Sequence, residues 1–94
     1  MRDYKKLIAA GNKAQIEKLK ENEHKKGFDD IDIMETLSLL YGEFKELEYE
    51  CVYSENIDAI RLEAADIANF AHMIILKCDE LLKENSRFVK FKGE

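Results

Sequence analysis

The stretch from Ile33 to Cys51 carries the strongest periodic pattern in the chain. Its apolar residues recur at alternating steps of four and three, and at about 100° per residue they fall within one stripe of a helix. No proline interrupts the 94 residues, and long alternating runs of β-branched residues are absent. The sequence therefore predicts an all-α fold. The positions of the stripe are Ile33, Leu37, Leu40, Phe44, Leu47 and Cys51.

Helical patterns cover most of the chain. Three helices are expected, at about residues 3–22, 31–52 and 57–84. Residues 85–94 alternate apolar and basic side chains and are a candidate tail. A chain of this length makes one domain, so we expect residues 1–94 to fold together.

The ends of the second and third helices have candidate caps. Asp29 or Asp30 can accept a hydrogen bond from an early amide of the second helix, and Ser54 or Asn56 can do so for the third. Because the link between these two helices is short, they should lie adjacent and antiparallel. We expect an antiparallel helical bundle.

The charge balance limits the class of protein. The net charge is −5, from 20 acidic and 15 basic residues, which argues against binding to DNA or RNA. No apolar run approaches the ~20 residues of a membrane span, and no signal peptide is recognisable. Cys51 and Cys78 are expected to be small core residues in a reducing compartment. We therefore expect a soluble cytoplasmic protein.

Two carboxylates interrupt the apolar face expected on the third helix. Glu63 lies within this face and Asp66 lies at its edge, although surface acids normally occupy the opposite side. An unpaired carboxylate in apolar surroundings costs several kcal/mol or becomes protonated. A positive charge is needed to compensate. The other residues of this face are Ala59, Ile60, Ile67, Phe70, Ile74 and Leu81.

The second helix adds further acids. Glu43 and Glu46 are three residues apart and can converge on one point, as can Glu63 and Asp66. Sixteen residues lie between Glu46 and Glu63, enough to end one helix, turn and begin the next. Antiparallel pairing would bring the two acidic pairs face to face. Four converging carboxylates predict a bound divalent cation, Mg²⁺ in preference, with Mn²⁺ as a substitute.

An alternative interpretation applies to each acidic pair. Glu43, Glu46 and the following Glu50 are also compatible with an ordinary solvated helix face. Glu63 and Asp66 have apolar neighbours and fit that interpretation less well.

The order of these motifs resembles that of the MazG-like all-α nucleoside triphosphate pyrophosphohydrolases. The first acidic pair reads "EFKE" at 43–46 and the second reads "EAAD" at 63–66, continued by "IANFAHMI". The stretch "KLKENEHKKGF", residues 18–28, is similar to a "K-L-x-x-N-x-H-K-G-G-W" segment of small phage and bacterial members, with Lys26 and Phe28 departing from it. The resemblance covers about residues 16–78.

The resemblance implies a Mg²⁺-dependent hydrolase that converts a (d)NTP, of purine deoxynucleotide type in some members, to the monophosphate and pyrophosphate. The four acids would hold the metal, and Glu43 or Glu46 would accept a proton from the attacking water. Basic and amide side chains upstream and downstream would contact the substrate, with solvated or capping roles as the alternative. These residues are Lys18, Asn22, His24, Lys25 and Asn69.

Two other classes of function are compatible with the same residues. The acidic stripe would pair with a basic helix in a non-catalytic interaction module, or the chain would be an inactive relative that binds a nucleotide without cleaving it. In every case three helices make a small core, so a homodimer or homotetramer is expected, in which two chains complete a four-helix core.

Overall fold

The computed structural model describes the backbone of residues 3–22 and 31–92, and the side chains of residues 3–22 and 31–84. The chain forms α1 (Tyr4–Glu21), α2 (Ile33–Tyr49), a π-helical turn η2 (Glu50–Ser54) and α3 (Ile57–Lys92). No strand occurs in the described parts of the chain. The predicted all-α fold is confirmed.

The start of α2 is held by a capping box. The Asp32 carboxylate accepts a hydrogen bond from the Glu35 amide at 2.8 Å, and the Glu35 carboxylate accepts one from the Asp32 amide at 3.2 Å. The cap is therefore Asp32, and the prediction of Asp29 or Asp30 was wrong. The box explains the difference, because only Asp32 has a glutamate three residues later to complete it.

The turn between α2 and α3 reverses the chain within a few residues. The π-helical turn is followed by its cap residue Glu55, whose φ of 54° is left-handed and whose amide donates to the Glu50 carbonyl at 3.0 Å. The Asn56 side chain then accepts a hydrogen bond from the Ala59 amide at 3.0 Å. Asn56, one of the two predicted residues, thus caps α3.

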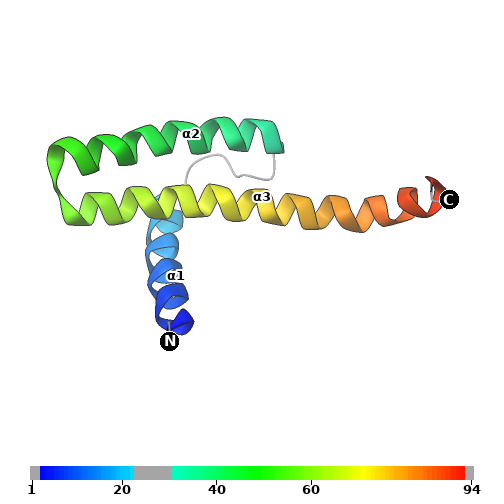
Figure 1. Ribbon diagram of the computed structural model, residues 1–94, viewed down its shortest axis with the longest axis horizontal. Coiled ribbons are helices and arrows are strands. Elements are labelled where there is room, and N and C mark those ends of the chain that lie inside the picture. Colours follow the sequence, from blue (N-terminus) through cyan, green and yellow to red (C-terminus); the bar gives the residue numbers. More distant parts are fainter. Residues whose placement is uncertain (1–2, 23–30, 93–94) are drawn as a thin grey trace.

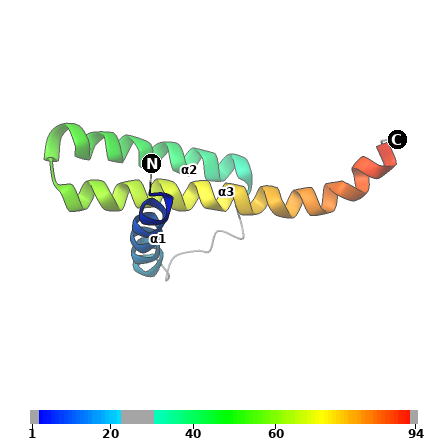
Figure 2. The ribbon, with the colours of Figure 1, turned by 60° about the horizontal axis from the view of Figure 1, so that its bottom comes forward.

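The helices α2 and α3 lie side by side and antiparallel, whereas α1 crosses α3 steeply (Figures 1 and 2). The C-terminal half of α1 lies against α3, and its N-terminal end stands away from the other helices (Figure 1). The antiparallel hairpin was predicted from the short link. The crossing of α1 was not.

The third helix is longer than the sequence pattern suggested. It continues to Lys92, through most of the segment predicted as a tail, and passes well beyond the start of α2 (Figure 1). No proline or glycine occurs between Ile57 and Lys92, and Gly93 follows directly. Without a helix-stopping residue, the backbone hydrogen bonds continue to the end of this stretch.

The interior of the chain is small. Among the described side chains, Ala14 and Ala65 are the buried apolar residues, and they lie where α1 meets α3. Half of the Phe44 side chain is exposed, although Phe44 belongs to the predicted core stripe, and Cys51 is exposed rather than buried. The stripe on α2 is thus helical as predicted but incompletely covered within one chain.

Within residues 3–22 and 31–92, no helix combines the length and the apolar character that a membrane crossing requires.

Candidate metal centre

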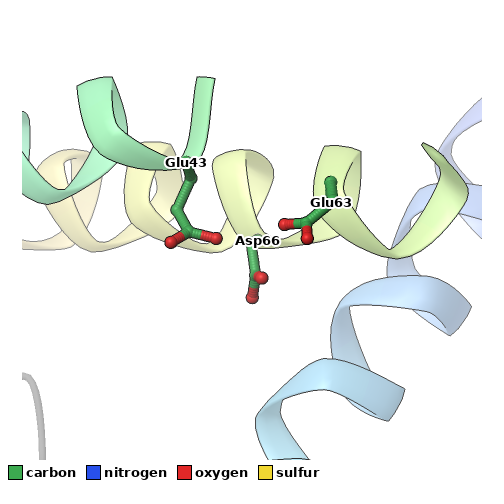
Figure 3. A group of neighbouring side chains, drawn as sticks. All are labelled: Glu43, Glu63 and Asp66. Carbon is green, nitrogen blue, oxygen red and sulfur yellow. The ribbon is translucent and has the colours of Figure 1, made fainter. Parts of the chain in front are cut away.

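Three carboxylates converge between α2 and α3. Glu43 reaches from α2 and Glu63 from the first half of α3 toward one another, and Asp66 lies beside them on α3 (Figure 3). One oxygen from each of the three lies within 4.8 Å of an oxygen of the other two. All three residues are partly buried. The antiparallel pairing of the helices therefore brings acids 20 or more residues apart to one point, as the sequence predicted.

Glu63 has the least compensated charge of the group. Its Oε1 atom is fully covered and has no hydrogen-bond partner, alone among the described side-chain atoms. Burial raises the pKa of Glu63, and repulsion from Glu46 and Asp66 adds to the rise. A hydrogen bond with Glu43 and the attraction of Lys18 partly offset these effects. A buried carboxylate oxygen without a donor is costly unless a cation meets it.

The pKa of Glu43 is raised for the same reasons. Burial, followed by a shared hydrogen bond with Asp66 and repulsion from Asp66 and Glu46, raises the pKa of Glu43 to about 8. The carboxyl of Glu43 thus keeps its proton at neutral pH in the absence of a cation. This proton lets Glu43 donate to its neighbours and reduces the negative charge of the group by one.

A lysine of α1 supplies the second compensating charge. The Nζ atom of Lys18 lies 3.2 Å from Asp66 Oδ2 and 3.5 Å from Glu21 Oε1. Partial burial opposes the ammonium charge, but the hydrogen bond to Asp66 and the attraction of both acids outweigh it, so the pKa of Lys18 is raised. Both side chains of the Lys18–Asp66 pair are mostly buried, at 16% and 13% exposure. The sequence predicted Lys18 as a substrate residue and missed this pair.

Glu46 does not join the group of three. Its side chain is exposed, one turn beyond Glu43 on α2, and among the described residues only Glu43, Glu63 and Asp66 converge. It lies close enough to raise the pKa of both Glu43 and Glu63 by repulsion. The described geometry thus brings three of the four predicted ligands together, with Glu46 beside them. The cause is the helical step, which turns the second residue of the pair toward solvent.

Asn69 lies one turn beyond Asp66 and joins α3 to α1. Its side chain is buried, its oxygen accepts a hydrogen bond from Gln15 Nε2 at 3.1 Å, and its amide donates to the Gln15 carbonyl at 3.1 Å. The Gln15 Nε2 atom also lies 2.8 Å from His72 Nδ1. Asn69 was predicted as a substrate residue. In the structure it holds α1 in place, and through α1 it positions Lys18.

A groove of about 300 Å³ lies between α1 and α3, and on α3 it begins at Asn69, one helical turn beyond Asp66. Its walls are mainly apolar, and Gln15, Asn69 and His72 bring polar atoms to it. Apolar walls with a few polar groups are typical of small-molecule sites. The full set of lining residues is Asn12, Gln15, Ile16, Leu19, Asn69, His72, Met73 and Leu76.

The remaining predicted substrate residues are not brought to the acids by described contacts. Asn22 ends α1, where its backbone amide donates to the Lys18 and Leu19 carbonyls. His24 and Lys25 lie outside the described residues. Arg61 pairs with Glu17 and Asp58 and not with the three converging acids.

The donor set fits a hard divalent cation. In proteins Mg²⁺ prefers carboxylate oxygens as ligands, and waters complete its coordination. The three carboxylates here, with one buried oxygen that has no hydrogen-bond partner, match this preference. Glu43, Glu63 and Asp66 would hold the ion. No local sequence pattern points to the Gln15 contacts or to the Lys18–Asp66 pair, because both join α1 to residues of α3 that are far away in the sequence.

The chain was compared with protein-family models, with curated proteins and with solved structures. No family model, curated protein or solved structure matches it.

Proposed function

We propose that the protein is a Mg²⁺-dependent nucleoside triphosphate pyrophosphohydrolase that converts a (d)NTP to the (d)NMP and pyrophosphate. The observation that supports this proposal most is the convergence of Glu43, Glu63 and Asp66 between two antiparallel helices, with Glu63 Oε1 buried and unpartnered. The MazG-like order of the acidic motifs adds to it. Nucleoside triphosphates are cytoplasmic metabolites, so a cytoplasmic location belongs to the same proposal.

The proposed reaction is an in-line attack of water on the α-phosphorus. A Mg²⁺ ion would neutralise triphosphate oxygens and lower the pKa of a water. The water oxygen forms a bond to the α-phosphorus while the bond to the oxygen bridging the α- and β-phosphorus breaks. The bridging oxygen leaves with that electron pair as part of pyrophosphate, and the water proton passes to a carboxylate of the site.

We assign the proton transfer to Glu46 and the ligand role to Glu43. Glu43 belongs to the converging group, whereas Glu46 stays exposed beside it and is free to reach a water. A carboxylate at this place can act as general base without leaving a metal. The sequence alone left the choice between Glu43 and Glu46 open.

Lys18 and the groove between α1 and α3 supply the substrate contacts of the proposal. With an ion at Asp66, the carboxylate would no longer need the positive charge of Lys18. The Lys18 ammonium would then be free to bind phosphate oxygens of the substrate. The groove begins at Asn69, one helical turn beyond Asp66, so the nucleoside would extend into it from the phosphates. Its apolar walls would cover the faces of the base.

The test is a panel of NTPs and dNTPs incubated with the protein and Mg²⁺, with separation of monophosphate, diphosphate and pyrophosphate. We expect monophosphate and pyrophosphate in equal amounts. The variant Glu63→Gln should lower turnover by at least about 100-fold, because it removes a charged ligand. Glu80→Gln changes the same charge at an exposed position of α3 and serves as the matched control.

Two results would contradict the enzymatic proposal. One is the absence of product from every nucleotide together with no heat of Mg²⁺ binding in calorimetry. The other is equal turnover in Glu63→Gln and Glu80→Gln. Nucleotide-dependent thermal stabilisation without product would identify a nucleotide-binding protein that does not cleave its ligand.

A further inference from the structure

Three side chains form a row of hydrogen bonds between α1 and α3. Asn69 Nδ2 donates to the backbone carbonyl of Gln15 at 3.1 Å, and Asn69 Oδ1 accepts from Gln15 Nε2 at 3.1 Å. Gln15 Nε2 also lies 2.8 Å from His72 Nδ1. Gln15 and Asn69 are each 7% exposed, whereas His72 is an exposed residue. The row thus leads from the buried helix junction to the surface of the groove that all three residues line.

A backbone carbonyl fixes the direction of every bond in this row. The Gln15 carbonyl can only accept, so the Asn69 atom that faces it is the amide nitrogen. The other atom of the Asn69 amide is then its oxygen, and the Gln15 side-chain atom that meets it is the nitrogen. An amide nitrogen only donates, so His72 Nδ1 accepts its second hydrogen. The hydrogen-bonding chemistry of these groups therefore leaves Nδ1 without a proton.

The other ring nitrogen of His72 is consequently a hydrogen-bond donor. In an imidazole whose Nδ1 accepts, the ring proton is carried by Nε2. Within residues 3–22 and 31–84, no acceptor is hydrogen-bonded to His72 Nε2. The residue is exposed and lines the groove, so the donor is accessible to a bound molecule. Because the buried amides hold the ring, a ligand would meet a donor that is already in place.

The remainder of the groove suits a flat, weakly polar group. Ile16, Leu19 and Leu76 line it and are 51%, 42% and 44% exposed, so apolar surface is open to a ligand. Its volume of about 300 Å³ is at the lower end of the range for small-molecule sites, about 300–1,000 Å³. Among the described residues, no acid, lysine or arginine lines it, so a phosphate would find no counter-charge there. The groove therefore favours an aromatic base over the phosphates of a nucleotide.

We propose that His72 recognises the base of the nucleotide by donating its Nε2 hydrogen to an acceptor atom of that base. This inference rests on the proposed function, which takes the nucleoside into the groove between α1 and α3. The carbonyl oxygens and unprotonated ring nitrogens of a base accept such a bond, whereas an exocyclic amino group does not. Gln15 determines which nitrogen of the imidazole carries the proton. His72 is thus the specificity-determining residue of the groove.

Two substitutions of His72 separate the two ring nitrogens. In His72→Asn the Oδ1 atom is bonded to Cγ, as Nδ1 is, and can accept from Gln15, but no donor replaces Nε2. In His72→Gln the amide nitrogen is one bond further from Cγ, as Nε2 is, and restores a donor.

The ligands are the non-cleavable α,β-methylene analogues of the dNTPs and of 2-deoxyribose 5-triphosphate, which lacks only the base. Calorimetry with Mg²⁺ should show that His72→Asn weakens binding of a dNTP analogue by about 10-fold, the usual effect of one hydrogen bond. His72→Gln should restore most of this affinity. Neither change should alter binding of the base-free analogue. The thermal midpoint of His72→Asn without ligand should equal that of the unmodified chain, because the bond from Gln15 is kept and Asn and His have similar helix propensities.

Nitrogen-15 NMR of the imidazoles tests the position of the proton without any ligand. The chain has two histidines, so the signal lost in His72→Asn identifies the ring, and it should show a proton on Nε2 and none on Nδ1. A proton on Nδ1 would overturn the proposal.

The binding results separate this proposal from the enzymatic one. Equal affinity of His72→Asn and the unmodified chain for the dNTP analogues, or an equal loss for the base-free analogue, would overturn the role of His72 while cleavage of natural dNTPs stands. A loss confined to analogues with a base, in a chain that cleaves no dNTP, would support the role of His72 and contradict the enzymatic proposal. Absence of binding by every analogue would overturn both.

Discussion

Lys18 Nζ lies 3.2 Å from Asp66 Oδ2 and ties α1 to the acidic group on α2 and α3. The ammonium contacts one of the three converging carboxylates, and the proton on Glu43 offsets another. Glu63 Oε1 is buried without a hydrogen-bond partner. One lysine and one proton thus offset part of the negative charge of the three carboxylates in the metal-free chain, and each of these can be tested.

Removal of the lysine should destabilise the metal-free protein. Lys18→Met breaks a mostly buried, charge-assisted pair, so we expect a loss of about 2 kcal/mol in the free energy of unfolding. Mg²⁺ should reduce this loss, because the ion supplies positive charge to Asp66. Urea unfolding at neutral pH with and without Mg²⁺ measures both effects. Lys13→Met, at an exposed position of α1, is the control, and an equal loss in both variants would count against the pair.

Mg²⁺ binding should release a proton from Glu43. With a pKa of about 8, this carboxyl is mostly protonated at pH 7, and a metal ligand must be ionised. We therefore expect release of about one proton per ion at pH 7, and markedly less at pH 9. Calorimetry in buffers of different ionisation enthalpy gives the number of protons. An affinity for Mg²⁺ that does not change between these pH values would refute the role of Glu43.

The stability of the metal-free protein should fall as the pH rises. The pKa of Glu43 is raised from 4.5 to about 8 on folding, so the folded chain binds this proton more tightly than the unfolded chain. The stabilisation is fully present below pH 4.5 and is lost as the pH rises through about 8. Thermal midpoints at constant ionic strength follow the loss. Glu43→Gln should flatten the profile, whereas Glu48→Gln, exposed on the same helix, should not.

Asn69→Ala should weaken the attachment of α1. The change removes both hydrogen bonds to Gln15 and leaves the buried Gln15 amide without them, at an expected cost of about 2 kcal/mol. Mg²⁺ affinity should change little, because its ligands come from α2 and α3. Turnover should fall, because Lys18 is no longer held at the acids. Asn12→Ala, at an exposed position of α1, is the control for stability, and Ser38→Ala, at an exposed position of α2, is the control for turnover.

A loss of Mg²⁺ affinity in Asn69→Ala as large as the loss of turnover would argue against this separation of roles. Unfolding curves, Mg²⁺ titrations and turnover measured on the same preparations distinguish the cases. A purely structural effect would lower stability without a separate effect on turnover of the folded fraction.

The helices and the acids were the predictable part of this structure. The recurrence of Ile33, Leu37 and Leu40 predicted a helix, because side chains three and four apart share a side of any α-helix. The short link from Glu55 to Asn56 required the next helix to return alongside. Glu43 and Glu63 were then expected to lie close together, because the rotation of about 100° per residue places both on the sides where the two helices meet.

The cap of α2 and the end of α3 were open to sequence reasoning but were placed wrongly. The pair Asp32 and Glu35 has the spacing of a capping box, which favours Asp32 over the acids before it. The stretch before Gly93 contains no residue that stops a helix, so α3 had no local reason to end at residue 84.

The position of α1 was decided by tertiary contacts alone. Gln15 of α1 contacts Asn69 of α3 across more than 50 residues of chain, and this contact places Lys18 near Asp66. Helical periodicity is a property of a few consecutive residues and determines which side chains share one face. It carries no information about which distant helix will lie on that face, because this choice depends on the packing of small side chains and on hydrogen bonds between helices. The sequence by itself therefore determined the hairpin and its acids, and only the tertiary structure decided the charge that balances them.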